Sequence, residues 1–177
     1  MDDLAMYLFD LTQNAIRAQA KHIRMTLHET TDELRLTLSD DGCGMDEQTL
    51  EQATSPYFTT RTTRKVGLGL SMIDMVAKQT EGTFKLDSKP GIGTNLYITF
   101  HHHHIDMPAI GNLGEMIMMI AIHQDVSDFT FIYEKEEQSY QFILSDMKTM
   151  FQETLSTYSV MDAMTQYINQ EINKVRG

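Results

Sequence analysis

Three polar residues near the N-terminus share one face of a predicted helix. Asp10, Asn14 and Arg17 follow one another at spacings of four and three residues, so their side chains are neighbours on the helix surface. Beside them runs a stripe with the period of a buried helix face, made of Leu4, Leu8, Leu11, Ala15 and Ala18. The polar row therefore lies along the edge of a buried surface. A carboxylate, an amide and a guanidinium in such a row predict a ligand that carries both a metal ion and phosphate.

Three glycine clusters add a second signal. They are DDGCG at residues 40–44, GLGL at 67–70 and GIGT at 91–94. Glycine lets the backbone approach a ligand closely and adopt positive φ. The second cluster opens a helix predicted from residue 68 to about 80, where free N–H groups and the helix dipole favour phosphate. Each cluster alone is weak evidence, because two-glycine loops are common in turns.

The elements that must position these residues alternate between helical and strand patterns. Residues 23–29, 33–40, 82–88 and 94–100 alternate apolar and polar side chains, which predicts paired strands with one wet face. A short helix is predicted at 47–53. Helices on one face of an antiparallel sheet give an α+β two-layer sandwich. The segment HHHHIDMPAIG marks a break, and a helix (113–123), a hairpin turning at EKEEQS and a closing amphipathic helix follow it.

Composition limits the classes of function. The net charge of −11 argues against a nucleic-acid partner, and no apolar run approaches the roughly 20 residues of a membrane span. The N-terminus lacks the pattern of a signal peptide. The single cysteine, Cys43, permits no internal disulfide, which is typical of a reducing compartment. We therefore expect a cytoplasmic protein.

The order of the motifs resembles a known family. An Asn-Ala pair on the first helix, then Asp-x-Gly-x-Gly, Gly-x-Gly-Leu and Gly-x-Gly-Thr, resembles the ATP-binding domain of sensor histidine kinases. That superfamily also contains gyrase, the ninety-kilodalton heat-shock chaperones and the MutL repair proteins. SPYFTTR, at residues 55–61, resembles the PFFTTK stretch of histidine kinases. The resemblance covers residues 1–104 and implies a Bergerat fold, with ATP and Mg²⁺ between the helical layer and a mobile lid.

The resemblance also implies roles for individual residues. Asn14 matches the asparagine that coordinates Mg²⁺, and Arg17 matches a basic phosphate contact. Asp40 matches the carboxylate that accepts a hydrogen bond from the adenine amino group. Met45 is an apolar wall for the base, and Thr94 matches a threonine that lines the pocket. Gly42 and Gly44 leave room for the base.

The lid and the phosphate-binding loop are implied in the same way. Arg61, Arg64 and Lys65 would neutralise the triphosphate. Gly67 and Gly69 would bring backbone N–H groups to the phosphates. The full set of ATP-binding positions implied in this region is Phe58, Thr59, Thr60, Arg61, Arg64, Lys65, Gly67, Leu68, Gly69 and Leu70.

Asp10 has two interpretations. Four residues before the metal asparagine, hydrolytic members and several protein kinases of the superfamily have Glu, and many histidine kinases have Asn or His. Asp10 could hold a metal-bound water or act as a general base. The alternative is a helix-surface carboxylate paired with a nearby lysine or arginine.

Other features have a chemical and a structural interpretation. His102 and His104 would share one face of a strand and could bind a metal, but a strand end running into a linker is favoured. Cys43 lies in the adenine loop and is either redox-sensitive or a small residue between two glycines. The methionines at 116, 118 and 119 fill core gaps or contribute to a partner surface.

The C-terminal region suggests a physiological setting for the protein. Residues 104–117 and 128–142 resemble the extension on small stand-alone ATP-binding proteins of anaerobic bacteria, which are encoded beside iron-only hydrogenase genes. We therefore divide the chain into an ATP-binding domain, 1–104, and an α+β extension, 105–177, that docks a partner or dimerises. The partner would be a phosphoacceptor or a hydrogenase-related protein, and a homodimer is also considered.

The predicted function is that of a histidine-kinase-like protein acting on a partner. The sequence starts in the first helix, so we expect neither the dimerising hairpin with its phosphoacceptor histidine nor the strand that usually precedes this helix. Transfer of phosphate would then occur in trans, as a kinase or nucleotide-dependent regulator of hydrogenase or redox control. The alternatives are a slow ATPase of the conformational-clamp type and a non-catalytic ATP sensor.

Overall fold

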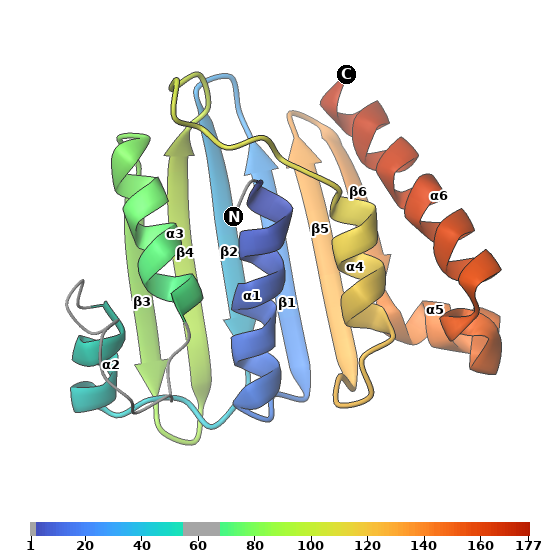
Figure 1. Ribbon diagram of the computed structural model, residues 1–177, viewed down its shortest axis with the longest axis horizontal. Helices are drawn as coiled ribbons and strands as arrows, with labels where there is room; N and C mark the ends of the chain where they lie inside the picture. The colour runs from blue at the N-terminus through green and yellow to red at the C-terminus, as the bar shows by residue number, and fades with distance from the viewer. Residues whose placement is uncertain (1–2, 55–67) are drawn as a thin grey trace.

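The computed structural model describes residues 3–54 and 68–177 as a two-layer α+β structure. Helices cover one face of a single sheet, with α1, α3 and α4 lying side by side across it (Figure 1). The helices are α1 (Leu4–Arg17), α2 (Glu47–Thr54), α3 (Leu68–Gln79), α4 (Leu113–Ala121), α5 (Leu144–Phe151), the 3₁₀ helix η2 (Gln152–Ser156) and α6 (Tyr158–Arg176). The strands are β1 (His22–Glu29), β2 (Glu33–Asp40), β3 (Thr83–Lys89), β4 (Gly93–His101), β5 (Asp128–Lys135) and β6 (Gln138–Ile143). The predicted α+β sandwich is confirmed.

Both halves of the chain contribute to the same sheet. Its six strands have the order β3-β4-β2-β1-β5-β6. All neighbours are antiparallel except β1 and β5, which run parallel, with Ile23 opposite Phe129 and Leu27 opposite Tyr133. Strand β5 therefore covers the edge of β1. The two strands of the C-terminal extension continue the sheet, and the division of the chain at residue 104 stays a prediction.

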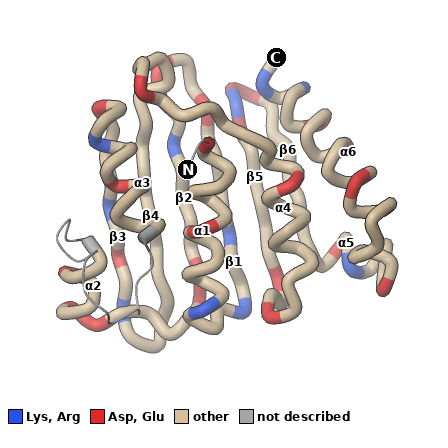
Figure 2. Tube along the Cα trace, viewed as in Figure 1, with Lys and Arg blue, Asp and Glu red and all other residues tan. Residues whose placement is uncertain are grey.

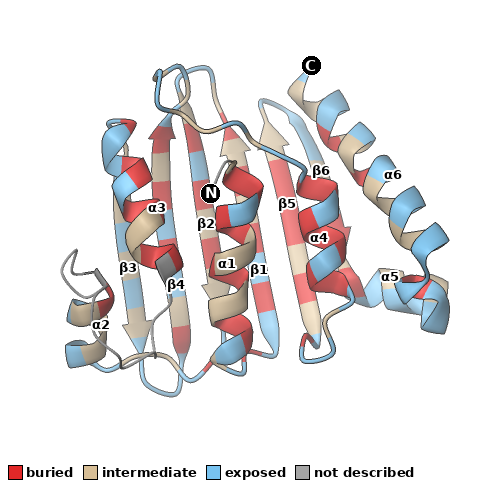
Figure 3. Ribbon diagram, viewed as in Figure 1, coloured by how far each residue is buried: buried red, intermediate tan, exposed pale blue. Residues whose placement is uncertain are grey.

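The period-two pattern of the strands determines which face of the sheet is buried. In β2, Leu34, Leu36 and Leu38 point to the helices and are buried, whereas Arg35 on the opposite face is exposed. The same alternation makes red and paler bands along the central strands (Figure 3). Each buried leucine removes apolar surface from water at about 25 cal/mol per Å². The core thus lies between the sheet and its helical layer.

The segment that was predicted to separate the two regions is hydrogen-bonded to α1. Asp3 caps this helix by accepting a hydrogen bond from the Met6 N–H at 3.0 Å. The Leu4 N–H donates to the carbonyl of Ala109 at 2.8 Å, and the Ala5 N–H donates to the carbonyl of Ile110 at 3.0 Å. These bonds satisfy N–H groups that have no partner inside a helix. The connecting segment therefore fastens the start of α1.

Helix α6 is fastened to the start of α4 by a second set of hydrogen bonds. The Asn169 side chain accepts a bond from the Gly114 N–H at 2.8 Å and donates to the Asn112 side chain at 2.7 Å. Asn112 is itself the N-cap of α4. The two helices approach so closely at Gly114 that an added Cβ would lie 2.4 Å from the carbonyl oxygen of Thr165. Glycine is required there by packing.

A buried carboxylate joins the end of β1 to the C-terminal extension. Glu29 is 4% exposed and accepts a short hydrogen bond from the Tyr133 hydroxyl. Its carboxylate also pairs with the Lys135 ammonium at 3.2 Å and with the Arg176 guanidinium at 3.3 Å. His102 Nε2 lies 3.7 Å away. Burial acts to raise the pKa of Glu29, but the bonds from Tyr133 and Lys135 and the Arg176 charge outweigh it and lower that pKa.

Within the described residues, no helix is both long enough and apolar enough to cross a membrane.

Candidate functional site

A cavity of about 520 Å³ lies between the C-terminal half of α1 and the sheet. Its walls combine an apolar surface with a few polar side chains, which is typical of small-molecule sites. The lining residues are Leu11, Asn14, Ala15, Arg17, Ala18, Leu38, Asp40, Cys43, Gly44, Met45, Asp46, Thr49, Leu70, Leu86, Pro90, Thr94 and Leu96. The structure thus brings together the predicted residues Asn14, Arg17, Asp40, Met45 and Thr94.

Asp40 is placed by the register of the sheet. It is the last residue of β2 and lies two positions after the buried Leu38, so its side chain points toward the helices. Thr94 lies directly opposite on β4. The carboxylate accepts hydrogen bonds from the backbone N–H groups of Gly42, at 2.9 Å, and Thr94. Burial raises the pKa of Asp40, and these two bonds only partly offset that effect.

Ser88 is a residue of the site region that the sequence interpretation missed. Its hydroxyl accepts a bond from the Met45 N–H at 2.9 Å, donates to the Gly93 carbonyl at 2.9 Å and lies 3.0 Å from the Thr94 hydroxyl. It therefore joins the loop after β2 to the β3–β4 turn. The alternation along β3, which places Ser88 on the same face as Leu86, was the available signal.

Two glycines let these loops meet. Gly44 has φ +65°, and an added Cβ would lie 2.0 Å from the carbonyl oxygen of Lys89. Gly93 has φ +126°, and an added Cβ would lie 1.9 Å from the carbonyl oxygen of Asp40. Any side chain would both clash and strain the backbone. Their role in the structure is therefore the close packing of two loops beside the cavity.

The end of α1 supplies the polar wall. Arg17 donates a hydrogen bond to the Asn14 amide oxygen at 3.2 Å. The amide nitrogen of Asn14 is buried and has no hydrogen-bond partner. A buried donor without a partner is costly, so the Asn14 amide is suited to a ligand that enters the cavity.

The polar groups of the cavity suit a Mg²⁺ ion that is bound together with a nucleotide, rather than a metal ion held by protein ligands alone. Among residues 3–54 and 68–177, no three histidine, cysteine, aspartate or glutamate side chains come together as metal ligands. The Asn14 oxygen keeps a second lone pair beside its bond from Arg17. Mg²⁺ commonly takes few protein ligands and keeps waters and phosphate oxygens. The residues present therefore fit a Mg²⁺ ion carried by a nucleotide.

Asp10 lies beside the start of α3. An added Cβ on Gly69 would lie 3.2 Å from the Asp10 Cβ, so Gly69 allows α1 and α3 to approach closely. Leu70, one residue later, lines the cavity, and Leu68 begins α3. The positions predicted for the lid and the remaining phosphate contacts fall outside the described residues; they are Phe58, Thr59, Thr60, Arg61, Arg64, Lys65 and Gly67.

The structure also shows where the predicted histidine, cysteine and methionine features lie. His101 ends β4, and the run that follows forms a turn rather than a strand, so His102 and His104 do not share a strand face. Cys43 is exposed and lines the cavity. Of the methionine group at 116, 118 and 119, the first two are buried in the core and the last is exposed.

Comparison with known families identifies the fold and its ligand class. The protein-family model described as "Histidine kinase-, DNA gyrase B-, and HSP90-like ATPase" matches residues 2–104, which is more than half of the chain. The chain belongs to this family. It is an ATP-binding, histidine-kinase-like domain, and its cavity lies within the matched residues.

Sensor kinases are among the similar sequences of this ATPase family. Sensor protein kinase FleS of Pseudomonas aeruginosa is 42% identical over 95 residues, which cover 52% of this chain and 23% of FleS. Sensor histidine kinase ZraS of Escherichia coli is 33% identical over 95 residues, which cover 52% of this chain and 20% of ZraS. The chain thus spans about a fifth of the length of these relatives.

A solved structure supports the fold over a longer stretch. The N-terminal domain of a DNA repair protein superposes with a TM-score of 0.54 at 13% identity, covering 86% of this chain and 58% of that one. At this identity the likeness shows the fold alone. Its coverage extends beyond the family match and into the C-terminal extension.

Proposed function

We propose that this protein binds ATP with Mg²⁺ in the α1–sheet cavity and acts in trans as a kinase or nucleotide-dependent regulator of a partner protein. One observation carries the proposal: a single cavity places the half-buried carboxylate of Asp40 at the sheet and the Asn14–Arg17 pair at the end of α1. A base-binding acceptor and a phosphate-binding cation are thereby held by rigid elements of the fold. The resemblance of the extension to proteins encoded beside iron-only hydrogenases supports a setting in hydrogenase or redox control.

Each side chain has a role in this proposal. Asp40 accepts a hydrogen bond from the adenine amino group, and Met45 and Leu96 contact the base. Arg17 neutralises phosphate charge. Asn14 supplies an amide oxygen to Mg²⁺, which would offset the charge of the phosphates. In phosphoryl transfer the γ-phosphoryl group leaves ATP for a nucleophilic side chain of the partner, and ADP is released.

The placement of the histidines supports action in trans. All seven histidines of the sequence lie within the described residues, and none of them is in a helix. His22 is tied through Nδ1 to the Asp41 carboxylate at 2.7 Å, and His102 faces Glu29. A phosphoacceptor on a helix, as the family resemblance implies, would therefore come from outside these residues.

Calorimetry tests the proposal directly. ATP and a non-hydrolysable analogue are each titrated into the protein with and without Mg²⁺, and γ-labelled ATP is then offered together with cell extract fractions. Binding of both nucleotides that strengthens with Mg²⁺ is the expected result. Absence of heat at millimolar nucleotide would overturn the proposed function.

The affinity for ATP is expected to depend on the protonation of Asp40. Only the carboxylate is a pure acceptor for the adenine amino group, and burial raises the pKa of Asp40 above its ordinary value of 3.8. Affinity should therefore be constant near neutral pH and fall about tenfold for each pH unit below the raised pKa. Titrations from pH 7.5 to 3.5 measure this. A midpoint at or below 3.8 would contradict the assignment.

The position of Asp10 supports a slow ATPase of the clamp type as a second candidate. Its side chain lies at the α1–α3 contact and one turn before Asn14, on the same helix face. For a clamp with Asp10 as the general base, Asp10→Asn should lower ATP turnover at least about 100-fold and change ATP affinity less than twofold. Steady-state release of phosphate measures turnover, with the exposed Asp162→Asn on α6 as the control.

The outcomes separate the candidates. Wild-type protein that binds ATP without releasing phosphate excludes the clamp and leaves the kinase or the sensor. Turnover that Asp10→Asn leaves intact shows that another group activates the water.

A further inference from the structure

The two edges of the sheet differ in how they are protected. Edge strand β3 carries Lys85, Asp87 and Lys89 on its exposed face, and α2 packs against it. Charged side chains on an edge strand discourage pairing with a further strand. These charges appear as coloured segments along β3, whereas β6 is tan throughout (Figure 2). The β3 edge is therefore protected against pairing with a further strand.

The β6 edge also has a helix packed against its strand, α6, but it lacks charged side chains. Its sequence, QSYQFI, contains no charged residue, proline or glycine. Within the described residues β6 pairs only with β5, so the backbone groups along its outer edge have no strand partner. Gln138, Ser139 and Gln141 are exposed, and Phe142 on the helix side is buried. An uncharged edge strand is a template for another strand.

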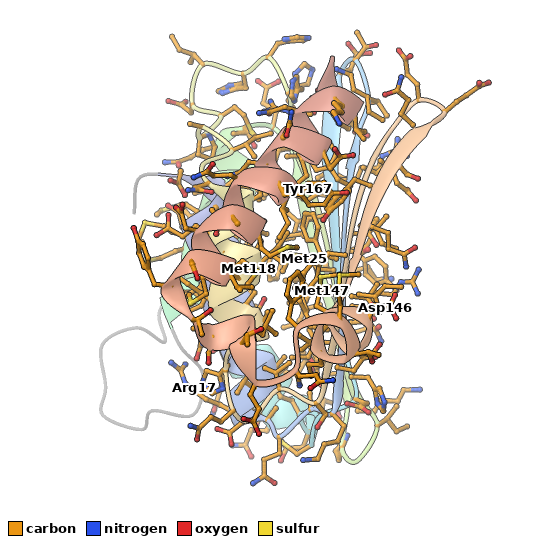
Figure 4. The ribbon with its side chains drawn as sticks, turned by 90° about the vertical axis from the view of Figure 1, so that its right-hand side faces the viewer. Arg17, Met25, Met118, Asp146, Met147 and Tyr167 are labelled. Carbon is orange, nitrogen blue, oxygen red and sulfur yellow. The ribbon has the colours of Figure 1, made fainter. Side chains whose placement is uncertain are left out.

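Exposed aromatic and apolar side chains lie on the same side of the molecule. Helix α6 contacts β6, and Tyr167 on this helix is 51% exposed (Figure 4). At the turn from α5 into α6, Met150 is 68% exposed and Tyr158 is 85% exposed. An exposed aromatic side chain on the helix that contacts β6 adds contact area for a chain that pairs with this edge.

We propose that β6 pairs antiparallel with β6 of a second copy of this chain about a two-fold axis, so that one sheet runs through both copies. A two-fold contact uses the same surface on each copy, which an uncharged strand allows despite the net charge of −11. The choice of direction follows from the turn before β6, which carries Glu136 and Glu137 and lies next to Glu134 near the end of β5. Antiparallel pairing places the two acidic turns at opposite ends of the contact, whereas parallel pairing would place them side by side.

The side chains of β6 match this arrangement. Directly opposite residues of antiparallel strands point to the same face. Pairing centred on Gln141 uses residues 139–143 and places Gln141 beside its own copy. It also places Tyr140, which is half-buried, opposite Phe142, which is buried, on the helix side. The polar side chains remain on the wet face.

Sedimentation equilibrium tests this contact. Wild-type protein at 1–200 µM is expected to show a concentration-dependent mass that rises toward twice the chain mass of 20.3 kDa. Gln141→Lys places two ammonium groups beside each other at the axis and should raise the dimer dissociation constant at least about tenfold. Thr83→Lys, which adds the same charge to the exposed face of β3, is the matched control and should leave the dimer unchanged.

The proposed dimer contact can be tested independently of the nucleotide site. Retained ATP binding and an unchanged far-UV circular dichroism spectrum show that Gln141→Lys is folded. A wild-type monomer at 200 µM would overturn the proposal. So would a dimer that Gln141→Lys leaves intact, or one that Thr83→Lys disrupts.

Discussion

Asp40→Asn is expected to weaken ATP binding about 100-fold and to change the free energy of unfolding by no more than about 1 kcal/mol. The adenine amino group is a donor, so it requires an acceptor at this place. To keep the bond from the Gly42 N–H, which is 2.9 Å long in the native chain, the Asn oxygen must take the place of Oδ1, so the NH₂ group, which is a donor, replaces the other carboxylate oxygen. The adenine amino group would then face another donor, so it would lose this hydrogen bond as well as its hydrogen bonds to water.

Stability should be retained because the native charge is unfavourable in the folded state. Burial raises the pKa of Asp40, so ionisation costs more in the folded chain than in the unfolded chain. Removing the charge therefore removes a cost, while the oxygen of Asn keeps one of the backbone bonds. Calorimetry gives the affinity, and chemical denaturation gives the free energy of unfolding.

Asp87→Asn on β3 is the matched control, because Asp87 is exposed on the face of the sheet opposite the helices. It should change neither quantity. Asp40→Asn protein that binds ATP as tightly as wild type would show that the base is recognised elsewhere. Asp40→Asn protein that fails to fold would show that its bonds to Gly42 and Thr94 are structural.

The sequence sufficed for the local parts of this structure. Alternating leucines in β2 and the apolar stripe of α1 predicted both elements, and with them the faces on which Asp40 and Asn14 lie. The motif order predicted the family, which the match over residues 2–104 confirms. These features are periodic or contiguous, so each window of sequence contains its own evidence.

The remaining features depend on contacts between distant segments. Nothing local indicates that β5 pairs with β1 in parallel, because Phe129 lies far along the chain from Ile23. The segment before α4 looked like a linker, since its carbonyls at Ala109 and Ile110 contact α1 through backbone atoms alone. The sequence analysis predicts no helix at α5, because only its first residue, Leu144, is buried.

Glu29→Gln is expected to lower the free energy of unfolding by about 3 kcal/mol, which is about 6–12 °C in Tm for a chain of this size. The native carboxylate is buried and compensates the charges of Lys135 and Arg176 at 3.2 and 3.3 Å. Gln keeps the shape of the side chain but removes that charge. Two partly buried cations would then lie close together without a counter-charge.

The effect should disappear in acid. The pKa of Glu29 is lowered in the folded state, so its stabilising contribution is present above the unfolded-state value of 4.5 and is lost as the pH falls through the folded-state value. The difference between wild type and Glu29→Gln should therefore be constant from pH 6 to 8 and shrink below pH 4.5.

Denaturant unfolding at a series of pH values measures this difference. Glu33→Gln is the control, because Glu33 also pairs with a cation, Arg35, at 2.9 Å, but on the exposed face of the sheet. Exposed pairs contribute at most about 1 kcal/mol. Equal effects of the two substitutions would show that the Glu29 pairs merely offset their own desolvation. A large effect confined to Glu29→Gln would make this buried carboxylate the main polar link between β1 and the C-terminal extension.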